Sequence, residues 1–160
     1  PTFPNARYLF AKKELEWSQA QVKNQDWTFE DSVQPILEAG LAEIVESDFA
    51  LNDQIWLEPQ PGHTPGHVAV RMHSRGKNAV MSGDLIHHPI QLAHPDWSPV
   101  YDDDPVLARI TRRRFLEDQA DKDILMMTAH FPLPSVGYVI SKGDAFGFRY
   151  ADDVGTVHGS

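Results

Sequence analysis

The distribution of apolar and polar positions predicts a chain in which short strands alternate with helices. Residues 6–10 have the composition of a strand, and a polar helix is expected to follow at 11–21. A second helix is expected to begin near Ser32 and to stop at Gly40, with apolar residues at helical spacing between them. Extended segments are then predicted at residues 41–50, 53–58, 68–72 and 78–84.

The C-terminal part continues this pattern. Asp104 is expected to cap a helix that has Pro105 in its first position and runs to about Ala120. An apolar strand is predicted at 123–129, and it ends at His130. The length of 160 residues suits one domain, which we place at residues 1–152, with a flexible polar tail at 153–160.

Composition excludes several classes of site and partner. The chain contains no cysteine, so disulfides, cysteine-ligated zinc and thiol nucleophiles are excluded, and any metal must be held by His, Asp or Glu. A net charge of -9 argues against nucleic-acid and anionic-membrane partners, and no apolar run is long enough to span a bilayer. We therefore expect a soluble protein, with the cytoplasm as the favoured location.

Three residues of metal-ligand type stand just beyond predicted strands. His63 follows the segment at 53–58, Asp84 ends the segment at 78–84, and His130 follows the last strand. Strand ends are held rigidly by the core while the next residue faces solvent, which a preformed metal site requires. A single such residue is more often structural, but three at equivalent positions favour a metal site.

The segment PGHTPGH at residues 61–67 contains the first of these ligands. We assign His63 as the ligand, and we expect Thr64 to fix its ring through a local hydrogen bond. Pro65 and Gly66 complete a turn, so His67 should project differently and orient or stabilise the turn. The alternative is that both histidines only pack in the interior.

These motifs resemble those of a known family. PGHTPGH, then SGD at the end of a strand, then AH after a further strand are similar to the C-terminal half of the metallo-β-lactamase-fold hydrolases. The flanking segments PTFPNARYLFAKKELEW, YDDDP, ARITRRRFL and TAHFPLPSVGYV most resemble the branch of methyl parathion hydrolase and the acyl-homoserine lactonases. The resemblance extends to about residue 140.

The resemblance implies an αββα sandwich with a two-metal centre at one sheet edge. It gives His63 as a ligand of the first metal, Asp84 as the carboxylate that bridges both metals, and His130 as a ligand of the second. In such a centre a metal-bridging hydroxide attacks the substrate, so Asp84 also counts as catalytic. Zinc is the expected metal, and manganese, iron or cobalt also suits a His and Asp set.

The sequence also departs from the family. The hallmark motif His-x-His-x-Asp-His should precede PTFPNARY, yet the chain has no His-x-His and its first histidine is His63. The resemblance therefore implies the C-terminal portion of the fold, with the N-terminal metal-motif half missing. We expect such a portion to associate with itself or to pair with that half, and to be inactive alone.

Other side chains are weaker candidates for the site. Loop histidines after Asp84 are equally explained by a substrate pocket and by solvation, and the aromatic residues are more often core. A hydroxyl donor to an oxyanion is a further hypothesis for Tyr138. Helix capping explains Asp104, and solvation is expected for Asp102 and Asp103. The pocket candidates are His87, His88, Trp97, Phe131 and Tyr138.

Two classes of function follow. The first is a metal-dependent hydrolase, or part of one, acting on a small ester, lactone or phosphotriester. Within this class a glyoxalase II-like thioester hydrolase is the alternative, disfavoured by the segments after Asp84 and around His130. The second class is a non-catalytic remnant of the fold that serves as an interaction or structural module.

Overall fold

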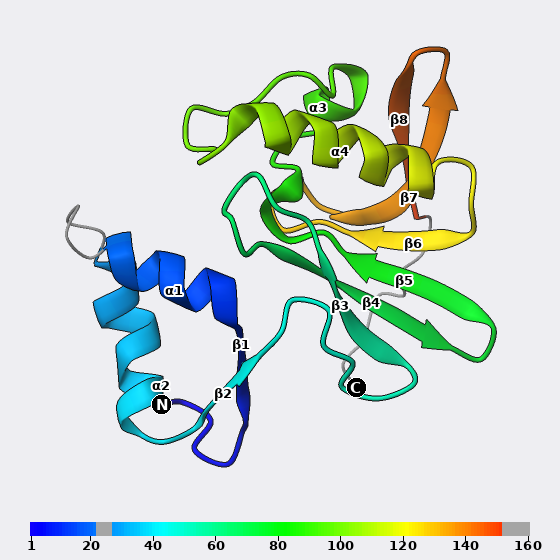
Figure 1. Cartoon of the computed structure of the whole chain (residues 1–160). Coiled ribbons are helices and arrows are strands. Elements are labelled where there is room, and N and C mark those ends of the chain that lie inside the picture. Colours follow the sequence, from blue (N-terminus) through cyan, green and yellow to red (C-terminus); the bar gives the residue numbers. More distant parts are fainter. Residues whose placement is uncertain (22–26, 152–160) are drawn as a thin grey trace.

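The computed structural model describes residues 1–21 and 27–151 (Figure 1). The tail predicted at 153–160 lies outside the described residues. The described elements are, in chain order, β1 (Tyr8–Ala11), α1 (Lys12–Gln21), the π-helical turn η2 (Phe29–Val33), α2 (Gln34–Glu38), β2 (Ala42–Val45), β3 (Ile55–Pro59), β4 (Val68–Ser74), β5 (Lys77–Met81), the 3-10 turn η3 (Gly83–Leu85), α3 (Ile90–Ala93), α4 (Pro105–Gln119), β6 (Ile124–Met127), β7 (Val136–Lys142) and β8 (Ala145–Tyr150).

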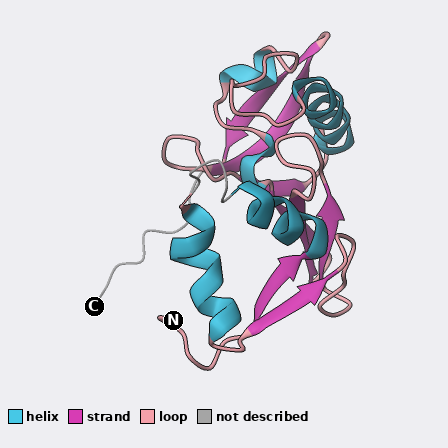
Figure 2. Cartoon of the chain, turned by 60° about the vertical axis from the view of Figure 1, so that its left-hand side comes forward, coloured by secondary structure: helices cyan, strands magenta, loops and turns pink. Residues whose placement is uncertain are grey.

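A six-stranded mixed sheet forms the larger part of the molecule. Its strands lie in the order β3-β4-β5-β6-β7-β8, with β5 and β6 parallel and all other neighbours antiparallel. β1 and β2 form a separate parallel pair, which lies with α1 and α2 in the smaller part of the molecule (Figure 1). Seen from a second direction, helices flank the strands in both parts (Figure 2).

The predicted elements are confirmed in their main features, with corrections at their ends. Asp104 caps α4 by accepting hydrogen bonds from the backbone N–H groups of Val106 and Leu107, and Pro105 is the first helical residue. The extended segment predicted at 41–50 is wrong beyond β2. The second helix begins earlier than expected because a π-helical turn precedes α2. Sequence analysis missed α3 and the hairpin of β7 and β8.

α4 covers one face of the large sheet. Phe115 and Leu116 of this helix are buried, and they share one apolar core with Val80, Met126 and Val139 from three strands. Burying a side chain of this size contributes about 1.5–3 kcal/mol each. The core therefore fixes the positions of these strands and of the residues that directly follow them.

The opposite face of the large sheet is only partly buried. Side chains alternate between the two faces of a strand, so the neighbours of the core residues point away from α4. Among them, Met81 is 48% exposed. The apolar side chains of this open face, none of which is fully buried, include Val70, Met72, Ala79, Met81, Leu125, Met127 and Tyr138.

Strand direction determines where the candidate ligands meet. β4 is antiparallel to both β3 and β5, so β3 and β5 run in the same direction, and β6 is parallel to β5. The ends of these three strands therefore reach one edge of the sheet, where His63, Asp84 and His130 follow them. Within residues 1–21 and 27–151, no helix combines the length and apolar character needed to cross a membrane.

The turn that contains His63 packs tightly against α4. Gly62 has a φ of +137°, and a Cβ atom there would lie 2.4 Å from the Cα atom of Ala108. A substitution must therefore change both the backbone conformation and the contact with the helix. Gly76, with a φ of +75°, has nothing within 4 Å of such a Cβ.

We expect Gly62→Ala to destabilise the fold more than Gly76→Ala. The left-handed conformation alone costs about 1–2 kcal/mol, and overpacking at Gly62 adds about 1–3 kcal/mol. Urea denaturation of both variants measures the two losses in free energy of unfolding. Equal losses would show that the turn does not pack closely on α4.

Candidate metal centre

The turn of residues 61–67 is held by the start of α4. The backbone N–H of Asp103 donates to the carbonyl of His63 at 2.9 Å, and the N–H of Asp104 donates to the carbonyl of Gly62 at 3.0 Å. The positive φ at Gly62 lets the chain approach the helix at this point. The backbone of His63 is therefore fixed by the segment that leads into α4.

α1 holds the same turn from a second direction. The hydroxyl of Thr64 donates a hydrogen bond of 2.6 Å to Glu14, and the indole of Trp17 donates to Asp103. The expectation that Thr64 fixes the ring of His63 is wrong, because its hydroxyl reaches α1 instead. Thr64 acts on the turn as a whole and not on the imidazole.

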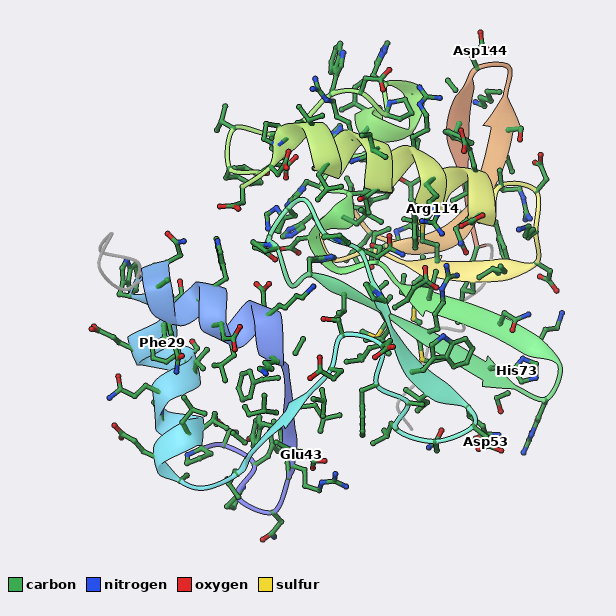
Figure 3. All side chains as sticks on the ribbon, viewed as in Figure 1. Phe29, Glu43, Asp53, His73, Arg114 and Asp144 are labelled. Atoms are coloured by element: carbon green, nitrogen blue, oxygen red, sulfur yellow. The ribbon has the colours of Figure 1, made fainter. Side chains whose placement is uncertain are left out.

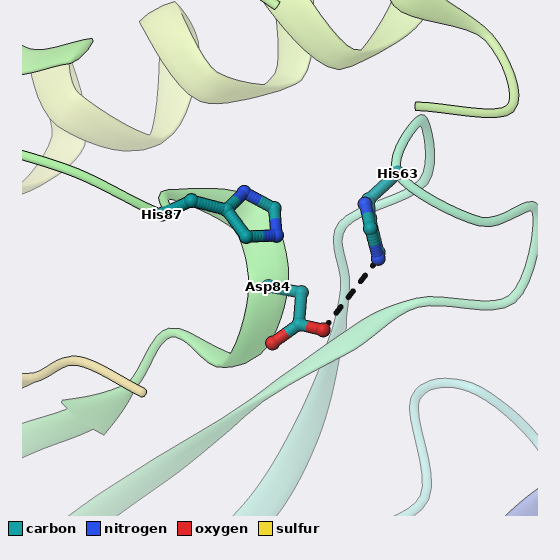
Figure 4. A group of neighbouring side chains, drawn as sticks. All are labelled: His63, Asp84 and His87. Atoms are coloured by element: carbon teal, nitrogen blue, oxygen red, sulfur yellow. Dashed lines mark ion pairs between the residues drawn. The ribbon is translucent and has the colours of Figure 1, made fainter. Parts of the chain in front are cut away.

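Asp84 stands between two imidazoles. Its Oδ2 lies 3.5 Å from Nε2 of His63, and its Oδ1 lies 2.9 Å from Nε2 of His130. The first of these pairs is drawn as a dashed line in Figure 4. The side chains of Asp84 and His130 are 43% and 46% exposed, so the pair can be reached from solvent.

His67 supports the backbone of Asp84. Its Nδ1 donates to the carbonyl of Gln60 at 3.2 Å, which leaves Nε2 free to accept from the backbone N–H of Asp84 at 2.9 Å. Gly83 leaves room for this contact, since a Cβ there would lie 2.7 Å from Nε2 of His67. This geometry suits the predicted orienting role, and it directs His67 to Asp84 instead of to a metal.

His87 lies closer to the centre than the sequence indicated. One ligand atom from each of His63, Asp84 and His87 lies within 4.8 Å of the other two (Figure 4). The ring of His87 stacks on that of His130, with centroids 4.8 Å apart. Its Nδ1 is buried and has no hydrogen-bond partner among the described residues. His87 can therefore provide a further nitrogen donor as well as part of the pocket wall.

The charges at the centre are those that a metal ion requires. Burial raises the pKa of Asp84, but the hydrogen bond and charge of His130 and the charge of His63 outweigh it and leave that pKa below its ordinary value. Burial, together with the charge of His63, lowers the pKa of His87 to about 4 and also lowers that of His67. At neutral pH the carboxylate is therefore ionised beside neutral His67 and His87 rings, and metal ligands must be deprotonated.

A shallow cavity of about 330 Å³ opens over these residues. It is lined by His63, Asp84, His87, His130 and Tyr101. Tyr101 was missed by sequence analysis; its ring stands edge-on to His63 and His87, with centroids 6.0 and 5.0 Å away. Cavities of about 530 and 520 Å³ beside α4 are larger, but no histidine lines either.

Four of the predicted pocket residues lie outside this cavity. His88 is exposed and accepts a hydrogen bond from the backbone of Ile90, and Trp97 stacks on His94. Phe131 is buried in the core, where its ring contacts Phe148. Tyr138 belongs to the open face of the sheet, where the guanidinium of Arg149 lies over its ring. It does not line the cavity over Asp84, so this position does not suit a donor to an oxyanion formed there.

The expectation for Asp102 is wrong. Its side chain is completely buried, and it contacts both His63 and Arg112. No local pattern distinguishes Asp102 from its neighbours Asp103 and Asp104, because the contacts that bury it come from distant parts of the chain. The ring of His63 thus lies between two carboxylates, with Asp102 at Nδ1 and Asp84 at Nε2.

Several solved structures share this architecture. AidC, described as a dizinc quorum-quenching lactonase in complex with a product, is 27% identical with a TM-score of 0.79, covering 96% of this chain and 57% of AidC. The hydrolase AbOPH of the beta lactamase superfamily is 21% identical with a TM-score of 0.84, covering 94% and 57%. A probable metal-dependent hydrolase from Staphylococcus aureus is 20% identical with a TM-score of 0.69, covering 94% and 55%.

The chain has the metallo-β-lactamase fold. The resemblance read from the sequence motifs is confirmed, and the fold corresponds to the C-terminal portion of the αββα sandwich. The chain spans between 55% and 57% of the length of these three structures. No family model and no curated protein sequence matches it.

The support that His67 gives to Asp84 can be tested by zinc titration. We expect His67→Ala to weaken zinc binding about 10–100-fold while some metal remains bound, as is typical for residues that orient metal-bound groups. His73→Ala is the control, because His73 is exposed and lies near the β4–β5 turn, at the other end of the sheet (Figure 3). Complete loss of zinc in His67→Ala, with binding retained in His63→Ala, would reverse the two roles.

Proposed function

We propose that this chain is part of a metal-dependent hydrolase and supplies His63, Asp84 and His130 to a centre for two divalent ions. The main support is the carboxylate of Asp84, whose two oxygens face the Nε2 atoms of two different histidines at 3.5 and 2.9 Å. A carboxylate placed in this way fits a bridging role. Nitrogen and oxygen donors suit zinc first, and manganese, iron or cobalt next.

The residues of the chain prepare the site for hydrolysis. Divalent ions held by these residues would polarise a carbonyl or phosphoryl oxygen and would lower the pKa of bound water. Asp84 holds negative charge between the two imidazoles, and His67 fixes its backbone from behind. His87 adds no positive charge at neutral pH because its pKa is about 4. Tyr101 provides an exposed aromatic wall against which the apolar part of a substrate can pack.

A small lactone is the favoured substrate. Hydrolysis of esters and phosphotriesters would require the same chemistry, namely polarisation of a carbonyl or phosphoryl oxygen and attack by hydroxide. AidC, which is similar over 96% of this chain, is described as a lactonase with a homoserine product bound. A second solved structure, an N-acyl homoserine lactone hydrolase at 21% identity, is described with a related product at its catalytic metal centre. The open and shallow cavity of this chain suits a small ligand that is also contacted from another side.

We propose that a further portion of the protein, or a second copy of the chain, covers the open face of the sheet. Apolar side chains such as Met81 are exposed there, and contiguous apolar surface of this kind favours association. The portion that the similar structures have in addition to the matched length would also supply the other metal ligands. The same face supports the second candidate function, an interaction or structural module without catalysis.

Asp84→Asn in the intact protein that contains this sequence tests the hydrolase. Loss of the bridging charge should reduce metal content and lactone hydrolysis together. Both losses should exceed the loss of about 10–100-fold that is typical when a residue that only orients a metal ligand is replaced. Asp53→Asn, which changes an exposed aspartate, is the control. Residues 1–160 made alone should be inactive with zinc, manganese and cobalt, and should associate in solution.

Three results would contradict this function. Full metal content and normal turnover in Asp84→Asn would exclude the bridging role. A monomer of residues 1–160 that binds two metals and hydrolyses lactones or phosphotriesters would show that other residues build the centre. Inactivity of the intact protein on lactones, esters and phosphotriesters would favour the interaction module instead.

A further inference from the structure

A buried arginine lies behind the candidate metal centre. Arg112 of α4 has a side chain that is 1% exposed. Its Nε donates to the carbonyl of Leu85 at 2.9 Å, and its Nη1 donates to the carbonyls of Pro95 and Trp97 at 3.0 and 2.8 Å. Its Nη2 lies 3.3 Å from Oδ2 of Asp102. One guanidinium thus joins the helix, the residue that follows Asp84, and the loop that leads to Asp102.

Asp102 links this arginine to His63. Its side chain is completely buried, and Oδ1 lies 3.1 Å from Nδ1 of His63. An ionised carboxylate can only accept hydrogen bonds, so the proton of the His63 ring must be on Nδ1. In the neutral ring Nε2 of His63 then carries no proton, and it is this atom that faces Oδ2 of Asp84.

Stability alone gives a poor account of this arrangement. A buried ion pair costs desolvation of both charges, and a well-packed apolar pair of similar volume is often equally stable or more stable. The neighbouring carboxylates have separate contacts, since Asp103 accepts from Trp17 and Asp104 caps α4. Asp102 alone of these three reaches the ring of a candidate ligand.

We propose that Asp102 is a positioning residue that holds His63 in the tautomer required for metal binding, and that Arg112 holds Asp102 in place. The proposal rests on the proposed function, because it treats His63 as a ligand. Arg112 also contacts the carbonyl of Leu85, so the same side chain fixes the chain next to Asp84. The relative position of the two ligands then depends on one buried guanidinium.

The substitution Asp102→Asn should reverse the tautomer of His63. Arg112 has only donors, so the amide oxygen of Asn should turn toward the guanidinium and its NH₂ group toward His63. That NH₂ group donates to Nδ1 and forces the ring proton onto Nε2, the atom that faces Asp84. The same substitution in a Ser-His-Asp triad produces the wrong histidine tautomer.

The test is the tautomer of His63 in metal-free, ¹⁵N-histidine-labelled protein, read from long-range ¹H–¹⁵N correlation spectra at a pH where the ring is neutral. We expect the Nδ1–H tautomer in the wild type and in the control Asp103→Asn, and the Nε2–H tautomer in Asp102→Asn. His63→Gln identifies the resonance. Zinc affinity should fall about 10–100-fold in Asp102→Asn and stay unchanged in the control.

The outcomes separate this proposal from the proposed function. An Nε2–H tautomer in the wild type, or an unchanged tautomer in Asp102→Asn, would overturn it. If Asp102→Asn does not fold, the wild-type spectrum alone decides between the two tautomers. A wild type with the Nδ1–H tautomer that binds no zinc would support the positioning by Asp102 and would overturn the metal centre instead.

Discussion

The common direction of β3, β5 and β6 is the constraint on which the candidate centre depends. Each of these strands is paired within one sheet, and β5 and β6 are fixed on the helix side by the apolar core under α4. The three segments that leave them meet at one edge, so their side chains approach one another. The side-chain atoms of His63 and His130 then lie 3.5 and 2.9 Å from the carboxylate of Asp84, and ligands held on rigid elements in this way suit a metal site.

α4 connects the stability of the fold with the geometry of the centre. Its apolar residues Phe115 and Leu116 pack on the sheet, the segment before it holds the turn of residues 61–67, and Arg112 reaches behind Asp84. Of the three consecutive arginines in this helix, Arg112 is buried, Arg113 is partly buried and Arg114 is exposed, so they do not form one solvated basic patch. Changes that shift α4 should therefore affect folding and ligand positions together.

The sequence predicted those features that neighbouring residues determine. His63, Asp84 and His130 each follow a local apolar run, so their shared edge could be inferred from strand ends. The hairpin of β7 and β8 was missed although its turn at Gly143 and Asp144 has a typical hairpin composition.

The remaining features depend on contacts between distant segments. Asp102 looks like its acidic neighbours, and its burial is apparent only from its contacts with His63 and Arg112, which come from distant segments. Tyr101 reaches the cavity because it lies in the same loop as Asp102. Tyr138 lies on the open face of the sheet. The alternation of side chains along a strand shows which residues share a face, but not which face is covered by a helix. His87 approaches Asp84 through a short irregular segment whose course has no periodic signal.

Anomalous diffraction at the zinc edge, from crystals of this chain soaked in zinc, tests the central claim most directly. The account predicts density beside the carboxylate of Asp84, with Nε2 of His63 or of His130 at a coordination distance of about 2.0–2.1 Å. Zinc bound only at other histidines, with Asp84 free of metal, would contradict it.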